Sequence, residues 1–240
     1  MPELTLVTFN THYGVRSPRE RGVPYDLGGV LDRLAADVMV VQEVWRPDGV
    51  GGLVDEFAAR HGYAVHHVAT GRATLRKAWP HHDPDGEGTA GTAVLTRVGA
   101  RPAPPIAVGP TLGDPAPARA LPQVDVEVDG DRPLRVVGVH LTSRLPYGPP
   151  AQLRRLAGAL PAAGVPTVVA GDCNFWGPGV VALMGGRWRR GVTGRTWPAA
   201  RPHSQIDHVL VRPGDVQVVD AAVLDPCGSD HRPLFARLAW

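Results

Sequence analysis

Ten short apolar runs recur along this chain, and they constrain its fold more than any other feature. The runs are short, rich in β-branched residues and flanked by Gly or Pro, a pattern that is typical of β-strands. We therefore expect strands at residues 4–9, 38–42, 63–69, 91–98, 124–128, 134–141, 166–172, 205–212, 216–224 and 234–240.

Three other segments show the spacing of an amphipathic helix. The clearest is 151–160, where Leu153 and Leu156 fall on the same face of the predicted helix. Similar patterns predict helices over 28–37 and 53–60. Strands that often follow one another, with helices between them, indicate an α/β fold: a two-sheet α/β sandwich of mostly antiparallel or mixed sheets with the helices outside.

No internal repeat divides the chain, and strand-like runs resume on both sides of its longest irregular segments. The Pro/Ala/Gly-rich segment 97–122 and the polar segment 76–88 are therefore expected to be loops within one domain. We expect residues 1–240 to form a single domain with a sizeable core.

The composition argues against some classes of protein. A formal net charge of +2 is too small for a strongly basic nucleic-acid binder, although it is compatible with a local basic groove. We find no signal peptide and no apolar run near the roughly 18 residues of a membrane span. The two cysteines suit free thiols in a cytoplasmic protein, which we expect to be a monomer.

Several predicted strands begin or end with polar side chains. Asp172 and Asn174 follow one apolar run, and Asn10 and His12 follow the first. A buried carboxylate is costly unless it is paired, and residues two apart on a strand face the same side. We therefore expect the strand ends to converge on one edge of the sandwich, with Cys173 turned away into packing. The same pattern recurs at Glu43, His140, Asp207, Asp230 and His231.

These residue types suit a divalent metal ion. The carboxylates of Glu43 and Asp230, with the carbonyl oxygen of Asn10, are hard oxygen ligands that favour Mg²⁺ or Mn²⁺ over zinc. Such an ion polarises a phosphoryl oxygen and stabilises charge on a leaving oxygen.

The remaining polar residues suit proton transfer. Imidazoles beside carboxylates, such as His140 with Asp207 or His231 with Asp172, hold or transfer protons near neutral pH. An amide such as Asn174 orients a water or contacts a phosphoryl oxygen. Together with the ion, these residues predict hydrolysis of a phosphate ester by water.

Six motifs occur in a fixed order along the chain: TFNTH, VVQEVW, VVGVHL, GDCN, IDHV and SDHRP. Each alone is weak, but the combination resembles the endonuclease/exonuclease/phosphatase superfamily, which has the DNase I-like fold. The resemblance runs from residue 5 to residue 238. It implies a two-sheet α/β sandwich and divalent-metal-dependent cleavage of phosphodiesters or phosphomonoesters.

The resemblance also implies a role for each residue around the metal and the water. Glu43 resembles the principal metal ligand of the family, with Asn10 and Asp230 beside it. Asp172 resembles the acid that aligns or activates the attacking water. Asn174 resembles the amide that holds this water or the phosphate.

Further roles concern the phosphate and the leaving group. His231 resembles the phosphate-contacting histidine, which the family orients by a carboxylate that we equate with Asp207. His140 occupies the position of a group that helps to stabilise the leaving group. His12 stands where many nucleases of the family carry an acid, which weakens a two-metal mechanism.

Some residues admit both a functional and a structural interpretation. Trp176 is the best candidate for a wall of the substrate site, and His12 is a possible substrate contact. We favour a loop thiol over a nucleophile for Cys227. We interpret the pairs His66–His67 and His81–His82 as structural or solvated residues and not as zinc ligands.

We expect a Mg²⁺-dependent or Mn²⁺-dependent phosphoesterase that acts on a phosphodiester, with nuclease activity possible. Basic segments at 71–77, 187–195 and 201–205 could line a groove for nucleic acid. A small-molecule or lipid phosphatase fits the near-balanced charge equally well. The alternative from another class is a catalytically weak binding protein on the same fold.

Overall fold

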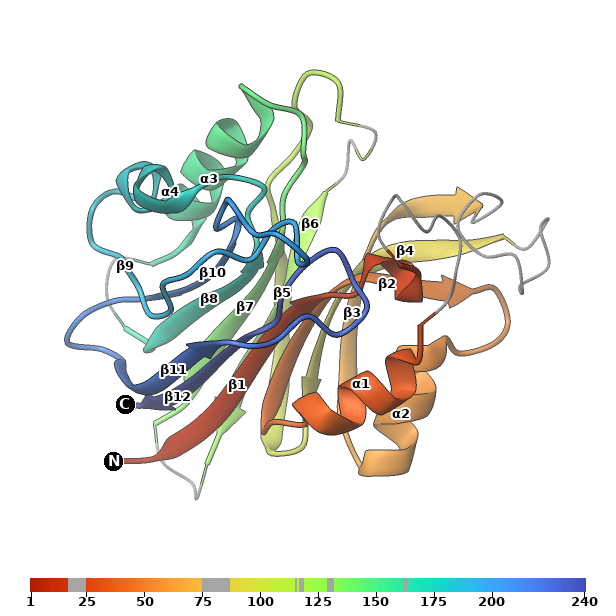
Figure 1. Cartoon of the computed structure of the whole chain (residues 1–240). Coiled ribbons are helices and arrows are strands. Elements are labelled where there is room, and N and C mark those ends of the chain that lie inside the picture. The colour runs from red at the N-terminus through yellow and green to blue at the C-terminus, as the bar shows by residue number, and fades with distance from the viewer. Residues whose placement is uncertain (17–24, 75–86, 115, 117–118, 129–131, 162–163) are drawn as a thin grey trace.

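The structure is a computed structural model that describes the chain except for residues 17–24, 75–86, 115, 117–118, 129–131 and 162–163. Two six-stranded mixed sheets form its centre (Figure 1). The first sheet has the order β11-β12-β1-β2-β4-β3. Its strands are β1 (Glu3–Asn10), β2 (Val38–Pro47), β3 (Ala64–Thr74), β4 (Glu87–Thr96), β11 (Gln217–Val223) and β12 (Leu234–Ala239).

The second sheet has the order β5-β6-β7-β8-β10-β9. Each sheet contains one parallel pair, β1 with β2 and β7 with β8, and its other pairs are antiparallel. The strands of the second sheet are β5 (Gly99–Ala107), β6 (Ala120–Glu127), β7 (Leu134–His140), β8 (Thr167–Asp172), β9 (Arg189–Arg190) and β10 (Asp207–Val211).

Helices cover the outer face of each sheet (Figure 1). The first sheet packs against α1 (Leu27–Leu34) and α2 (Leu53–His61), and the second packs against α3 (Gly148–Ala159) and α4 (Gly177–Leu183). The structure therefore confirms the two-sheet α/β sandwich with helices outside.

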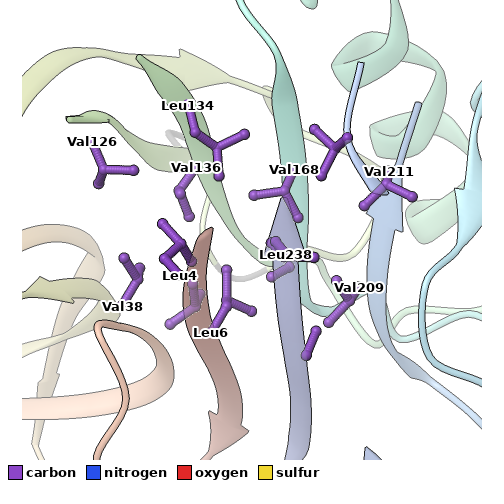
Figure 2. Packing of buried hydrophobic residues seen from close by; sticks show 14 of the residues in the cluster. Leu4, Leu6, Val38, Val126, Leu134, Val136, Val168, Val209, Val211 and Leu238 are labelled. Carbon is purple, nitrogen blue, oxygen red and sulfur yellow. The ribbon is translucent and has the colours of Figure 1, made fainter. Parts of the chain in front are cut away.

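The central strands are apolar on both faces, because one face of each sheet packs against the other sheet and the other face packs against helices. In β1, Leu4 and Leu6 belong to the cluster between the sheets, whereas Val7 and Phe9 pack toward the helices. Figure 2 shows part of the central cluster, to which the first sheet contributes residues such as Leu6 and the second sheet residues such as Val136 and Val168. Burial of one such side chain stabilises the fold by about 1.5–3 kcal/mol.

The prediction of a loop over 97–122 is wrong at both ends. Residues 99–107 form β5, and β6 begins at Ala120. The prolines are tolerated because β5 is an edge strand and because Pro104 and Pro105 lie where its register with β6 shifts. Of the predicted loop 76–88, residues 76–86 lie outside the described residues and the last two belong to β4.

The sequence patterns missed α4, which follows the GDCN motif. It is seven residues long and contains two glycines and a proline, so its helical signal is weak. Among the helices that the structure describes, none is long and apolar enough to cross a membrane.

Candidate active site

Three polar residues form a regular row across the second sheet. His140 at the end of β7 is the register partner of Asp172 in the parallel strand β8, and Asp172 is the partner of Asp207 in the antiparallel strand β10. Gly171 allows this close approach, because a Cβ there would collide with the Val139 backbone. Ordinary strand pairing therefore brings these three side chains to one edge.

The first sheet contributes Glu43 through a β-bulge. The register between β2 and β4 shifts between Val41 and Val44, and Glu43 has a left-handed backbone with φ of 54°. Such a φ is uncommon outside glycine, and bulges often redirect a side chain beside a functional site. The bulge lets Glu43 reach the edge where the row of the second sheet lies.

Asn10 links the two sheets at this edge. Its Nδ2 donates hydrogen bonds to Glu43 Oε1 and to Asp172 Oδ2, each at 3.1 Å. The side-chain oxygen of Asn10 accepts from the His12 backbone N–H at 3.0 Å, and its backbone carbonyl accepts from the Ser229 hydroxyl at 2.7 Å. In this arrangement the amide nitrogen of Asn10, rather than an oxygen, faces the two carboxylates.

The segment before β12 completes the cluster. His231 Nδ1 lies 2.9 Å from Asp207 Oδ2, and its Nε2 lies 3.9 Å from Asp172 Oδ2. Asp230 Oδ1 is 4.0 Å from the same Nε2, and its Oδ2 accepts from Trp197 Nε1 at 3.3 Å. The segment before β12 therefore brings both an acid and an imidazole to the row of the second sheet.

His140 closes the cluster on the side of the first sheet. Its Nε2 is 3.7 Å from Glu43 Oε1 and 4.0 Å from Asp172 Oδ2. A continuous set of contacts within 4.0 Å thus runs from Glu43 through His140, Asp172 and His231 to Asp230. The predicted site residues of the two sheets meet at one edge of the sandwich.

The Asp207–His231 pair is electrostatically matched. Burial raises the pKa of Asp207, but the positive His231 and hydrogen bonds outweigh burial and lower it overall. Burial lowers the pKa of His231, but the carboxylates of Asp207, Asp172 and Asp230, Asp207 foremost, together raise it to about 10. The folded protein therefore holds an imidazolium against a carboxylate in a water-poor position.

The other carboxylates carry an unbalanced negative charge. Burial is the main cause that raises the pKa of Asp172 to about 7, and it also raises the pKa of Glu43. The nearby charge of Asp230 raises the pKa of Glu43 further. Burial, followed by the positive charges of Arg119 and His231, lowers the pKa of His140 to about 3, so this ring is neutral. A bound cation would offset the unfavourable burial and mutual repulsion of the ionised carboxylates.

Asn174 lies beside Asp172, as the sequence predicts, but not through strand alternation. β8 ends at Asp172, and Asn174 has a left-handed φ of 48° in the turn that follows. Its backbone N–H donates to Asp172 Oδ1 at 2.7 Å, and its Nδ2 donates to the Leu141 carbonyl at 2.9 Å. Cys173 is buried in the cluster between the second sheet and its helices, which confirms its predicted place in the packing.

The two predicted substrate contacts lie on opposite flanks. His12 follows β1 in a short 3₁₀ turn, where its Nδ1 is 2.9 Å from the Val15 carbonyl. Trp176 is 53 % exposed and stacks on Phe175 just after the turn of Asn174. Their roles as substrate contacts stay predictions.

Other candidates lie outside the cluster. His66 and His67 are neighbours on β3, and His81–His82 lie outside the described residues. Burial raises the pKa of the Cys227 thiol to about 11, which leaves it a poor nucleophile.

Sequence reasoning missed a buried polar network behind His140. Arg119 Nη1 donates to the His140 carbonyl at 3.0 Å, and its guanidinium pairs with Asp114 at 3.0 Å. Asp114 also accepts from Gln152 Nε2 at 2.9 Å, and Gln152 Oε1 accepts from the Thr142 backbone N–H at 2.8 Å. Arg119 and Asp114 were hidden because both fall in the segment that composition marks as a loop. The signal that could have revealed this network was the presence of one acidic and one basic residue, Asp114 and Arg119, in a stretch that is otherwise apolar and rich in Pro.

The donor atoms fit a metal ion of the hard type. Asp172, Asp207 and His231 each place one ligand atom within 4.8 Å of the others. However, Nδ1 of His231 is hydrogen-bonded to both oxygens of Asp207, at 3.0 and 2.9 Å. The oxygens of Glu43, Asp172 and Asp230 are therefore the more available ligands, which suits an ion that prefers oxygen.

Comparisons with known proteins agree with this fold. No curated protein matches the chain. An endonuclease/exonuclease/phosphatase from Beutenbergia cavernae DSM 12333 is 24 % identical, with a TM-score of 0.72 over 99 % of this chain and 72 % of that one. A mannosyl-6-phosphatase from Bacteroides thetaiotaomicron VPI-5482 is 14 % identical, with a TM-score of 0.70 over 99 % and 100 %.

A third solved structure, D. rerio TDP2 complexed with a single-strand DNA product, is 14 % identical, with a TM-score of 0.65 over 100 % of both chains. At such identities these likenesses concern the fold alone. The family model described as "Endonuclease/Exonuclease/phosphatase family" matches residues 7–231. Because this match spans nearly the whole chain, the protein belongs to the endonuclease/exonuclease/phosphatase family.

Proposed function

We propose that this protein is a divalent-metal-dependent hydrolase of phosphate esters, with Mg²⁺ or Mn²⁺ as its ion. The observation that carries the proposal is the cluster at one edge of the sandwich. In it, contacts of 4.0 Å or less link Glu43, Asp172 and Asp230 through His140 and through His231 of the Asp207–His231 pair. Such a mixture of excess carboxylate and one fixed imidazolium suits a bound cation and an anionic substrate together.

Glu43 and Asp230 are the residues that would hold the ion, with Asn10 beside them. When bound, the ion would polarise a phosphoryl oxygen and offset negative charge on the leaving oxygen. The amide nitrogen of Asn10 fixes the orientation of Glu43 by its hydrogen bond. Its role as a metal ligand requires rotation of this amide or use of its backbone carbonyl.

Asp172 is the proposed acceptor of a proton from the attacking water. Its pKa of about 7, raised chiefly by burial, is close to the value that favours a general base at neutral pH. The Asn174 backbone N–H and the Asn10 amide fix its two oxygens, so that the carboxylate is held in one orientation. Asn174 thereby acts through Asp172. Its second proposed role is to contact the water or the phosphate.

His231 is the proposed donor to a phosphoryl oxygen. Its Nδ1 is held by Asp207, which leaves Nε2 directed toward Asp172 and Asp230. The raised pKa keeps the ring charged at neutral pH. His140, neutral and close to Glu43, is placed to assist the leaving group.

The substrate class follows less directly from the cluster. The relatives include one protein whose name is mannosyl-6-phosphatase and one bound to a single-strand DNA product, so both small esters and nucleic acids are hydrolysed or bound on this fold. We propose a phosphodiester as the first substrate class to test, with nuclease activity included. A small-molecule or lipid phosphatase is the second candidate.

A substrate panel tests the proposed function. Purified protein is assayed with bis-p-nitrophenyl phosphate, p-nitrophenyl phosphate, phospholipid vesicles and single-stranded DNA, each with Mg²⁺, with Mn²⁺ and with EDTA. Turnover that requires the ion supports the proposal. No turnover of any ester would favour a binding protein on the same fold.

A further inference from the structure

A pocket of about 240 Å³ opens directly from the carboxylate cluster. Glu43 and His140 form part of its lining, so they belong both to the cluster and to the pocket. The rest of the lining comes from β3, β4, the turn of Tyr13 and the segment that ends at Arg119. A group that is esterified to a phosphate at the cluster would therefore lie within reach of this pocket.

Small residues keep the pocket open. Gly71, Ala90, Gly91 and Ala116 line it, and none of them extends a side chain beyond Cβ. Its volume lies below the roughly 300–1,000 Å³ of typical drug-sized ligand sites. The size suits a single small ring or a short chain and excludes several nucleotides at once.

Two of the residues that line the pocket carry hydroxyl groups that are not used elsewhere. Tyr13 and Thr70 line it, and within the part of the chain that the structure describes neither hydroxyl has a hydrogen-bond partner. Tyr13 has a left-handed φ of 55°, an uncommon conformation, and it lines the pocket together with Glu43. Burial, followed by the charge of Glu43, raises the pKa of Tyr13, so its hydroxyl stays protonated and available to donate.

The two arginines of the pocket are already neutralised. Arg119 pairs with the buried Asp114 at 3.0 Å, and Arg72 pairs with Asp48 and Glu87 at 2.6 Å each. Nucleic-acid backbones are bound chiefly through cations that neutralise phosphates. A pocket whose cations are compensated favours an uncharged group over a second phosphate.

We propose that this pocket binds the uncharged, hydroxylated organic group of a small phosphate ester, such as a sugar or polyol, while the phosphate lies at the carboxylate cluster. The proposal rests on the proposed function and, of its two candidate substrate classes, selects the small-molecule phosphate ester. Thr70 and Tyr13 are its specificity-determining residues, because their free hydroxyls are the groups that would recognise the hydroxyls of the substrate.

Binding is measured first, in an Asp172→Asn background in which the attacking water lacks its base. Calorimetric titration with a hexose 6-phosphate, in the presence of Mg²⁺, measures the dissociation constant of this background. The same measurement is made after Thr70→Val, Ala90→Leu or Ala222→Leu is added to it, one substitution at a time. Thr70→Val should weaken binding about threefold to tenfold, the effect of one lost hydrogen bond. Ala90→Leu should weaken it by about tenfold or more through overpacking. Ala222→Leu, the same change on the exposed outer strand β11, should have no effect.

Turnover then separates this proposal from the proposed function. In the otherwise unchanged protein, Thr70→Val and Ala90→Leu should lower kcat/KM for the hexose ester more than for methyl phosphate. Equal losses for both esters would overturn the pocket proposal while leaving the hydrolase intact. A different result would support the pocket proposal and overturn the proposed hydrolase function. In it, the protein binds hexose phosphate, Ala90→Leu abolishes this binding, and no ester is turned over. Oligonucleotide cleavage that surpasses hexose ester turnover and resists both substitutions would overturn the pocket proposal alone.

Discussion

The two sheets contribute to the site in different ways. The second sheet delivers His140, Asp172 and Asp207 by regular register, one residue on each of three adjacent strands. The first sheet delivers Glu43 only through a bulge and a left-handed backbone. Regular pairing gives a rigid row at little conformational cost, whereas the bulge stores strain, of order 1–3 kcal/mol, to direct one carboxylate. We infer that the second sheet is the fixed frame and that Glu43 is the residue whose placement is specific to function.

Removing the charge of the bulged residue should have the largest effect on activity. Glu43→Gln keeps the shape of the side chain but removes a proposed metal ligand, so metal-dependent turnover should fall by about 10³-fold or more. The melting temperature should stay within a few degrees, since Glu43 is destabilised by burial rather than stabilised by a cation in the protein alone. Steady-state assays with Mg²⁺ and thermal unfolding measure both quantities.

Glu56→Gln is the matched control, because Glu56 is exposed on α2 and outside the cluster. It should change neither activity nor melting temperature. If Glu43→Gln keeps full activity, the bulged residue is not required for the reaction. The row of the second sheet would then be the whole active site.

The second largest effect should come from His231, which faces the row from the segment before β12. His231→Ala removes the proposed phosphate contact and should lower kcat by about 10²–10³-fold, the effect of one oxyanion donor. His61→Ala is the control, because His61 is exposed on α2 and pairs with Asp32. A loss of tenfold or less in His231→Ala would reduce this residue to a supporting role.

A smaller and pH-dependent effect should follow from Asp207→Asn, which alters the row itself. The pKa of His231, about 10 in the folded protein because of Asp207, should fall toward its ordinary value of about 6.5. If the charged ring is required, turnover at pH 8.5 should fall about tenfold more than turnover at pH 6. A pH–rate profile for each protein measures this shift, and Asp220→Asn on the exposed β11 serves as the control.

The same substitution has a defined signature in stability. A raised histidine pKa stabilises the folded state fully below pH 6.5, and this contribution is lost as the pH rises through about 10. The lowered pKa of Asp207 stabilises the folded state above its ordinary value of about 3.9 and is lost as the pH falls. The loss of melting temperature in Asp207→Asn should therefore be greatest near pH 5–6 and shrink toward pH 10. A loss that is constant with pH would show that the charge pair is not its cause.

The comparison of the two sheets also explains what could be predicted from the sequence. The apolar runs and polar strand ends predicted the sandwich and the meeting of its strand ends, because the apolar runs mark the buried strands and the polar residues mark where those strands end. The bulge at Glu43 left no such signal. The sequence predicted a strand that ends at residue 42, whereas β2 continues past Glu43 to Pro47, and a left-handed glutamate has no characteristic pattern. Its residue type and the resemblance to a family both pointed to Glu43 as a metal ligand, but neither revealed the bulge that places it.

Residues brought in by loops were hardest to predict. Arg119 reaches the His140 carbonyl from a Pro-rich segment, and Trp197 reaches Asp230 from a stretch without strand or helix periodicity. Their partners are 21 and 33 residues away in the chain, and no local pattern links positions at such separations. The sequence patterns also failed to predict the edge strand β5. Its prolines indicated a loop, but an edge strand forms hydrogen bonds on one side only and therefore tolerates them.

The smallest expected effect concerns Asn174, the left-handed residue on the side of the second sheet. Asn174→Gly and Asn174→Ala both remove the amide that donates to the Leu141 carbonyl and Asp172, so both should lower turnover to the same extent. They differ only in the backbone, where a φ of 48° disfavours alanine relative to glycine by about 1 kcal/mol. Urea unfolding should show this difference, with the glycine variant more stable. If the two are equally stable, the turn after β8 relaxes freely, and Asn174 cannot hold Asp172 in place. If only the alanine variant loses activity, the backbone conformation rather than the amide positions the base, and the second sheet then uses the same strained device as the first.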